Sequence, residues 1–128
     1  MNIHFTGIEQ TSLLPEDVRI QKIAVKPWSD GRRIGLVLQV DECQAPLNLD
    51  ISIMDENGLI LSTTSVVENL SSRTELTMHL RSPRHEGRYQ LDVTLFSVEI
   101  IEQPVSDQSR EPIKKRIIDK RQIWFNIH

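Results

Sequence analysis

Few residues of this 128-residue chain have the type and spacing that catalysis requires. A nucleophilic site needs an activated serine or cysteine, a base within reach and a donor for the oxyanion. Cys43 is the single cysteine, and its neighbours Asp41 and Glu42 disfavour the reactive thiolate. No Gly-x-Ser-x-Gly elbow occurs, and the five scattered glycines form no phosphate-binding loop. We therefore expect no enzymatic activity, although a carboxylate pair assembled only in three dimensions stays open as an alternative.

The residue types that can bind metals are scattered along the chain. The four histidines lack His-x-x-x-His spacing, and one cysteine cannot form a Cys-x-x-Cys pair, so we predict neither metal nor cofactor. Acidic pairs near strand ends leave one alternative, a small-ligand or Ca²⁺/Zn²⁺-responsive site on loops at one end of the fold. The residues concerned are His4, His79, His85, His128, Asp41, Glu42, Asp55 and Glu56.

Aromatic and basic residues give the better candidates, and these are candidates for a contact surface. Tryptophan and arginine are the side chains most enriched at binding hot spots. One group surrounds a turn and the other lies near the C-terminus, where Trp124 is expected to face outward. The structural alternatives are that Trp28 covers the core, that the arginines pair with nearby acids, and that Trp124 covers a sheet edge. The predicted partner-binding residues are Trp28, Arg32, Arg33, Lys120, Arg121 and Trp124.

Charge is distributed unevenly along the chain. Residues 110–128 carry six Lys or Arg against two Asp or Glu, a net charge of +4, whereas the whole chain carries −3. An acidic body with a basic C-terminal segment argues against a face that binds duplex nucleic acid. We expect a protein partner or self-association, with no nucleic acid, no membrane and no identified small-molecule substrate.

The chain length fits one domain, 1–128, with a lead-in over 1–17, a long polar loop over 103–112 and a C-terminal strand over 113–128. The single cysteine excludes an internal disulfide and favours a reducing compartment. No signal peptide is visible at the N-terminus, and no stretch approaches about 18 apolar residues. These features together favour a cytoplasmic location.

Period-two alternation predicts the strands that must position these residues. It is clearest in 47–54, Leu-Asn-Leu-Asp-Ile-Ser-Ile-Met, where Asn57-Gly58 then predicts a tight hairpin into 59–67. Similar alternation marks 33–41, 74–81 and 88–96. Each strand has one apolar and one polar face, as two packed antiparallel sheets require.

The first and last strands are less regular. In 18–26 the alternation slips between Ile20 and Ile23, which predicts a bulge. After Phe96 the strand can extend further, and the last strand is predicted to point Ile117, Ile123, Phe125 and Ile127 to one side. Short helical turns are expected within 12–18 and 66–72.

About seven strands with turns at regular spacing predict an all-β, immunoglobulin-like two-sheet antiparallel sandwich. Glu86-Gly87-Arg88-Tyr89-Gln90-Leu91 resembles the tyrosine corner of such domains, with Leu91 where antibody domains keep a cysteine. The pattern resembles disulfide-free bacterial immunoglobulin-like, fibronectin-type or macroglobulin-type domains. The stretch 30–96 also looks like small stand-alone bacterial proteins of unassigned function. This resemblance implies a fold and no activity, and the tyrosine hydroxyl is expected to bond back to the main chain.

The sequence therefore favours a non-catalytic protein-interaction or assembly module that uses a sheet face or an edge strand. The alternative is the ligand- or metal-responsive domain described above.

Overall fold

The computed structural model describes residues 13–69, 71–81, 86–100 and 113–127. Seven strands follow one 3₁₀ turn, η1 (Pro15–Asp17). The strands are β1 (Ile20–Pro27), β2 (Arg33–Val40), β3 (Leu47–Met54), β4 (Ile60–Asn69), β5 (Arg73–His79), β6 (Gly87–Ile100) and β7 (Ile113–Ile127). The predicted loop over 103–112 and most of the predicted lead-in over 1–17 lie outside the described residues.

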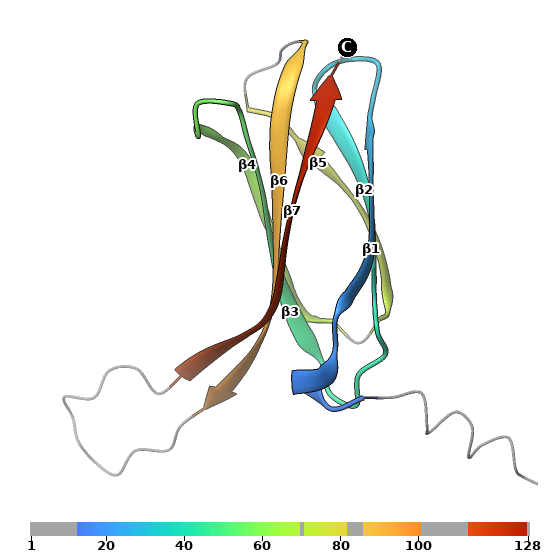
Figure 1. The fold of residues 1–128 in the computed structure, drawn as a ribbon, viewed down its shortest axis with the longest axis vertical. Coiled ribbons are helices and arrows are strands. Elements are labelled where there is room, and N and C mark those ends of the chain that lie inside the picture. The colour runs from blue at the N-terminus through green and yellow to red at the C-terminus, as the bar shows by residue number, and fades with distance from the viewer. Residues whose placement is uncertain (1–12, 70, 82–85, 101–112, 128) are drawn as a thin grey trace, which may run out of the picture.

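Two antiparallel sheets face each other, as Figure 1 shows. One sheet has the order β1-β2-β5, and the other has the order β4-β3-β6-β7. The predicted seven-strand, two-sheet sandwich is therefore confirmed. Because the tight turn after β3 returns β4 directly alongside it, β4 belongs to the four-stranded sheet.

The core lies between the sheets and consists of the side chains that alternation points inward. Ile34, Leu36 and Leu38 of β2 face Ile51 and Ile53 of β3 across the gap, and none of them exposes more than 2% of its surface. Strand β6 contributes a third row of buried side chains. The buried residues of β6 are Tyr89, Leu91, Val93 and Leu95.

Tyr89 packs as the tyrosine-corner resemblance implied. Its side chain is 5% exposed, and its ring stacks on Phe125 of β7 with the centroids 5.8 Å apart. Leu91, which the resemblance sets where antibody domains keep a cysteine, is fully buried. The bond from the Tyr89 hydroxyl to the main chain stays a prediction.

The hairpin between β3 and β4 closes through the predicted turn. Gly58 adopts φ +84°, a conformation that glycine takes without steric cost. The Asp55 carboxylate accepts hydrogen bonds from the backbone N–H of Asn57 (2.8 Å) and Leu59 (3.0 Å). The acidic side chain at this turn is thus a local structural element.

The predicted slip in the first strand is a bulge, because the pairing of β1 with β2 shifts register between Ile20 and Lys22. A second bulge was not predicted. Leu95 pairs with Asp119 but Phe96 pairs with Ile117, so Ile118 is the extra residue of β7. The bulge moves the β7 residues that precede Ile118 to the opposite face of the sheet from the one that regular alternation gives them. The prediction that Ile117 shares the inward face of Ile123 is therefore wrong, and Ile117 is 52% exposed.

The two predicted helical turns had different outcomes. A 3₁₀ turn occupies Pro15–Asp17, within the predicted span 12–18. The helical turn predicted over 66–72 is wrong, because residues up to Asn69 continue β4 and Arg73 begins β5. Pairing of β4 with β3 across the Leu47–Asn69 register outweighs the local sequence preference.

Candidate contact surface

The outer face of the four-stranded sheet carries a polar groove of about 440 Å³. Antiparallel register places Ser65, Asp50, Thr94 and Lys120 in one row across β4, β3, β6 and β7. The Asp50 carboxylate accepts hydrogen bonds from the Ser65 hydroxyl (2.8 Å) and from the Lys115 ammonium (3.2 Å). The groove is thus lined by paired polar groups suited to hydrogen bonding with a partner.

The second carboxylate of the groove is also engaged. Asp92 accepts a hydrogen bond of 2.7 Å from the side-chain amide of Gln90, its neighbour on the same face of β6. Asp50 and Asp92 lie in adjacent rows, so they form a carboxylate pair on this face. Asp50 accepts hydrogen bonds at both of its carboxylate oxygens and Asp92 accepts one at Oδ1.

Trp28, Arg32 and Arg33 surround the β1–β2 turn, as the sequence predicted. The Arg33 guanidinium lies 3.9 Å from the centre of the Trp28 ring and forms an ion pair of 2.8 Å with Asp30. Backbone N–H groups also hold this acid, because Asp30 Oδ1 accepts from Arg32 (2.9 Å) and Arg33 (3.2 Å). The hydrogen bond from the Arg32 N–H is the main cause that lowers the pKa of Asp30 to about 2.

This arrangement combines both interpretations of the turn. Arg33 pairs with an acid as the structural alternative expected, yet Trp28 remains 42% exposed. Its indole Nε1 lies 3.5 Å from where a side chain at Gly35 would begin, so the indole covers this glycine of β2. The turn therefore presents a stacked aromatic and guanidinium pair at the surface.

Trp124 faces outward on β7, as alternation predicted, and is 47% exposed. The Arg88 guanidinium of β6 lies 4.4 Å from the centre of its ring. Lys120 lies on the same outer face, in the groove, whereas the Trp28 cluster belongs to the turn of the other sheet. Five of the six predicted residues thus form two separate groups, Trp28, Arg32 and Arg33 at the turn and Lys120 and Trp124 on the outer face, and Arg121 belongs to neither.

Arg121 points in the opposite direction from Lys120 and joins the two sheets. Its guanidinium donates a hydrogen bond of 2.8 Å to the Ile20 carbonyl of β1. Asp119, two residues earlier on β7, accepts a hydrogen bond of 2.9 Å from the Ile20 N–H. We call these contacts of Ile20 with Asp119 and Arg121 the cross-sheet latch. Arg121 therefore has a structural contact, which sequence reasoning missed together with the role of Asp119.

Beyond the bulge, the end of β6 (residues 96–100) and the start of β7 (residues 113–117) form a two-stranded ribbon, which we call the basic ribbon. In Figure 1 its strands leave the body of the sandwich on the side away from β1 and β2. Among the described residues, β6 from Ser97 onward pairs only with β7, and β7 up to Arg116 pairs only with β6. Val98 is 44% exposed and Ile117 is 52% exposed.

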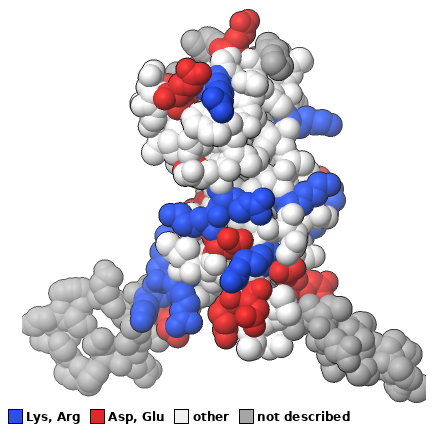
Figure 2. Space-filling model, in the orientation of Figure 1, with Lys and Arg blue, Asp and Glu red and all other residues white. Residues whose placement is uncertain are grey.

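The basic ribbon is amphipathic. Phe96, Val98, Lys115 and Ile117 share the outer face, and the Lys115 ammonium lies 4.2 Å from the centre of the Phe96 ring. Lys114 and Arg116 lie on the opposite face and are exposed. Figure 2 shows Lys and Arg side chains spread over the lower half of the visible face. The run Lys-Lys-Arg-Ile was visible in the sequence, but the bulge that exposes Ile117 was not.

The alternative prediction was a small-ligand or metal site on the loops at one end of the sandwich. A groove of about 390 Å³ there is lined by Asp55, Glu56, Glu86, Arg88 and Tyr89. Within the described residues no group of three or more His, Cys, Asp or Glu is arranged to hold a metal ion. His79 is exposed on β5, while His4, His85 and His128 lie outside the described residues.

Comparisons with known proteins show the fold alone. No family model matches the chain, and no curated protein matches it. A glycosyl hydrolase family 2 member from Bacteroides cellulosilyticus DSM 14838 is similar in structure, with a TM-score of 0.52 and 13% identity over 86% of this chain. A second structure of a family 2 member from Bacteroides cellulosilyticus gives a TM-score of 0.51 and 15% identity over 86% of this chain. The chain spans only 15% and 14% of those two proteins.

The part of the chain that the structure describes contains no helix long and apolar enough to cross a membrane.

Proposed function

We propose that this chain is a non-catalytic protein-interaction module of the cytoplasm. Its contact surface would comprise the basic ribbon and the adjoining lower part of the outer face of the four-stranded sheet. The observation that carries the proposal is the exposure of Val98 and Ile117 on strands that leave the body. A two-stranded ribbon is marginally stable by itself, and exposed apolar strand residues invite pairing with another chain.

The neighbouring sheet face supports the same surface. Val67 of β4, which follows the inward-facing Val66, is 70% exposed at the same end of the sheet as Phe96 and Ile117. A contact surface with an apolar centre and a polar rim is typical of protein interfaces. Here the polar rim consists of Asp50, Ser65 and Lys120, the row at the ribbon end of the groove, whereas Ile60 lines its far end.

The non-catalytic part of the proposal is supported by how the groove carboxylates are used. Asp50 is bound by Ser65 and Lys115, and Asp92 is bound by Gln90. A general acid or base needs a free proton position toward its substrate. Hydrogen bonds within the chain engage both oxygens of Asp50 and Oδ1 of Asp92, which is the support for a structural use of these acids.

A matched pair of substitutions tests the proposed surface. Ile117→Thr and Ile60→Thr change the same residue type at similar exposures, 52% and 49%, and Ile60 lies at the other end of β4 from Val67. A photo-crosslinking amino acid placed at Val98 would report contacts of the full chain in its native cells. Losing the apolar surface of Ile117 removes roughly 1–2 kcal/mol of burial, which corresponds to about tenfold in affinity.

We expect a discrete crosslinked product at Val98 that falls about tenfold with Ile117→Thr and is unchanged with Ile60→Thr. A photo-crosslinker at Thr77, exposed on β5 of the other sheet, should give no such product. Equal losses from both isoleucine variants, or the same product from Thr77, would overturn the proposal.

The groove beside the β3–β4 turn favours a second candidate, binding of a small ligand at the loop end. A thermal-shift screen with Ca²⁺, Zn²⁺ and small anions tests it, since a ligand at 100 times its Kd stabilises the fold by about 2.7 kcal/mol. A shift lost in Glu56→Ala would support this candidate, and a flat screen would count against it.

A further inference from the structure

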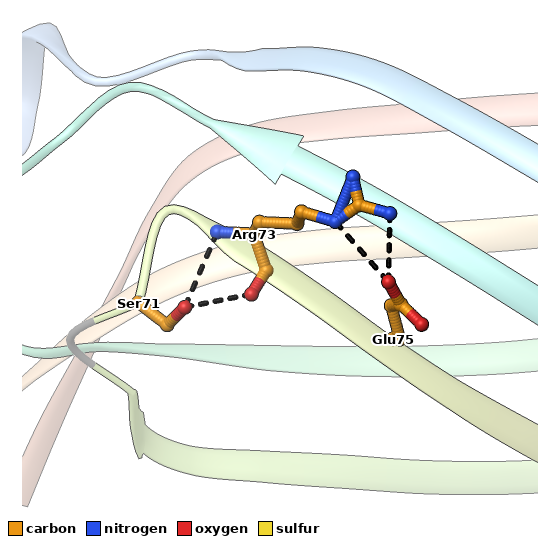
Figure 3. A network of polar contacts seen from close by, with 3 residues as sticks. All are labelled: Ser71, Arg73 and Glu75. Atoms are coloured by element: carbon orange, nitrogen blue, oxygen red, sulfur yellow. Dashed lines mark hydrogen bonds and ion pairs between the residues drawn. The ribbon is translucent and has the colours of Figure 1, made fainter.

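The four sheet edges are not equally available to another strand. In the three-stranded sheet, β5 begins with a capped edge, which Figure 3 shows. The Ser71 hydroxyl accepts a hydrogen bond from the Arg73 N–H (3.3 Å) and donates one to the Arg73 carbonyl (2.6 Å). Glu75 then holds the Arg73 guanidinium through two contacts of 2.7 and 3.2 Å. Side chains therefore occupy the backbone groups at which a partner strand would begin to pair.

A second edge is capped in the same way, and a third is irregular. The N–H and the carbonyl of Ile20 on β1 are bound by the cross-sheet latch. On β4, Glu68 has φ 51° and donates a hydrogen bond of 2.8 Å to the Asn48 side chain of the paired strand β3, at a register shift of the β3–β4 ladder, so this end of β4 is irregular. Such caps and irregularities are how sheet proteins block their edges against further pairing.

The edge of β7 over Lys114–Ile117 has no such cap. Within the described part of the chain no side chain bonds the backbone of these residues, and no strand pairs with β7 on the side away from β6. In an antiparallel strand every second residue directs its N–H and C=O toward the open side. These groups are therefore available to an added strand.

The two faces of β7 beside this edge would be complemented by different side chains of an added strand. On one face the neighbours are Lys114 and Arg116, which make no ion pair or side-chain hydrogen bond within the described residues. On the other face the neighbour is Ile117, since Lys115 is already engaged by Asp50 and Phe96. An added strand complementary to both faces alternates acidic with apolar residues.

Charge argues against a second copy of this chain as the occupant. Pairing of this segment with itself would set three positive residues, Lys114, Lys115 and Arg116, against three more. Like charges directly opposite each other destabilise a pair of strands. A segment of opposite charge gains attraction on the same edge.

We propose that a segment of another protein, extended and alternating acidic with apolar residues, adds as a strand to β7 along Lys114–Ile117. This inference rests on the proposed function and names the partner's chemistry. Main-chain hydrogen bonds supply affinity in strand addition, and alternate side chains supply specificity. Here the acidic residues would lie beside Lys114 and Arg116, and the apolar residues beside Ile117.

The test uses the full chain and a fluorescein-labelled eight-residue peptide in which glutamate and valine alternate, with binding measured by fluorescence anisotropy. The double variant Lys114→Glu/Arg116→Glu should weaken binding at least tenfold. The control Lys26→Glu/Arg81→Glu has the same net charge but changes exposed residues elsewhere, and it should bind as the wild type does. Equal weakening by the two variants would mean general charge attraction and would overturn the inference.

Two further peptides separate strand addition from other modes of contact. A peptide in which lysine and valine alternate should bind at least tenfold more weakly. The glutamate–valine peptide with methylated backbone nitrogens keeps its charge but cannot donate main-chain hydrogen bonds, so it should also bind at least tenfold more weakly. If the methylated peptide binds as well as its parent, no strand is added. The surface proposed above would still stand if Ile117→Thr reduces crosslinking at Val98 in cells, so the two failures are distinguishable.

Discussion

Replacing Asp119 by alanine removes half of the cross-sheet latch. The Asp119 carboxylate accepts a hydrogen bond of 2.9 Å from the Ile20 N–H in a partly buried environment. Ile20 lies at the β1 bulge, where the pairing with β2 shifts register. The carboxylate therefore satisfies a backbone donor at an irregular point of the ladder, and alanine leaves this donor without its acceptor.

The expected cost follows from the type of hydrogen bond. Bonds to charged groups contribute about 1.5–3 kcal/mol, and an unsatisfied buried donor costs a similar amount. We therefore expect Asp119→Ala to lower the free energy of unfolding by about 2 kcal/mol. At a urea slope of about 2 kcal/mol per M, the midpoint of unfolding would fall by about 1 M.

The assay is urea unfolding followed by circular dichroism at neutral pH. Asp92→Ala is the matched control, because Asp92 also accepts a hydrogen bond but only from the side chain of Gln90 on its own strand. The control should change the unfolding free energy by less than about 0.5 kcal/mol. Arg121→Ala, with Lys120→Ala as its control, tests the other half of the latch at the Ile20 carbonyl.

The two halves act on one residue, so their effects should not add. The double variant Asp119→Ala/Arg121→Ala should cost less than the sum of the single variants. If Asp119→Ala costs no more than Asp92→Ala, the latch does not hold β1 against β7 and the reasoning is refuted.

Two other predictions concern the core and the β1–β2 turn. Leu91→Ala, at a fully buried position, should lower the free energy of unfolding by about 2–5 kcal/mol in urea titrations, whereas Leu59→Ala, at a 60% exposed position, should change it by less than about 0.5 kcal/mol; similar costs would contradict the sandwich core. Because the pKa of Asp30 is lowered from 3.8 to about 2, its stabilising effect is complete above pH about 4 and is lost as the pH falls through about 2. The melting temperature of the wild type should therefore fall more steeply than that of Asp30→Asn between pH about 5 and about 2, and parallel slopes would contradict the Asp30 assignment.

Period-two alternation predicted the elements because it is a direct consequence of strand geometry. The inward rows of β2, β3 and β6 could be identified from the sequence since a one-residue shift would expose all of their aliphatic side chains. The hairpin at Gly58 was equally local, because Asn-Gly meets the conformational demand of a tight turn. The Trp28 cluster, too, is formed by residues within one turn.

The contacts between distant strands could not be predicted in this way. Asp119 meets Ile20 across 99 positions of the chain, and no local pattern marks either residue for the other. The bulge at Ile118 had no signal in the sequence, because the alternation of Ile117 with Ile123 fits a regular strand. Bulges arise from how two strands pair, so their position is decided by the partner strand.

The sequence by itself determined a two-sheet β-sandwich, a turn with one aromatic and two arginine side chains, and a basic final strand, since each depends on neighbouring residues and on alternation. Only the tertiary structure decided which edges are capped and which face Ile117 takes. The reason is physical: a backbone donor is satisfied by whichever group the fold brings within about 3 Å, and that group can come from anywhere in the chain.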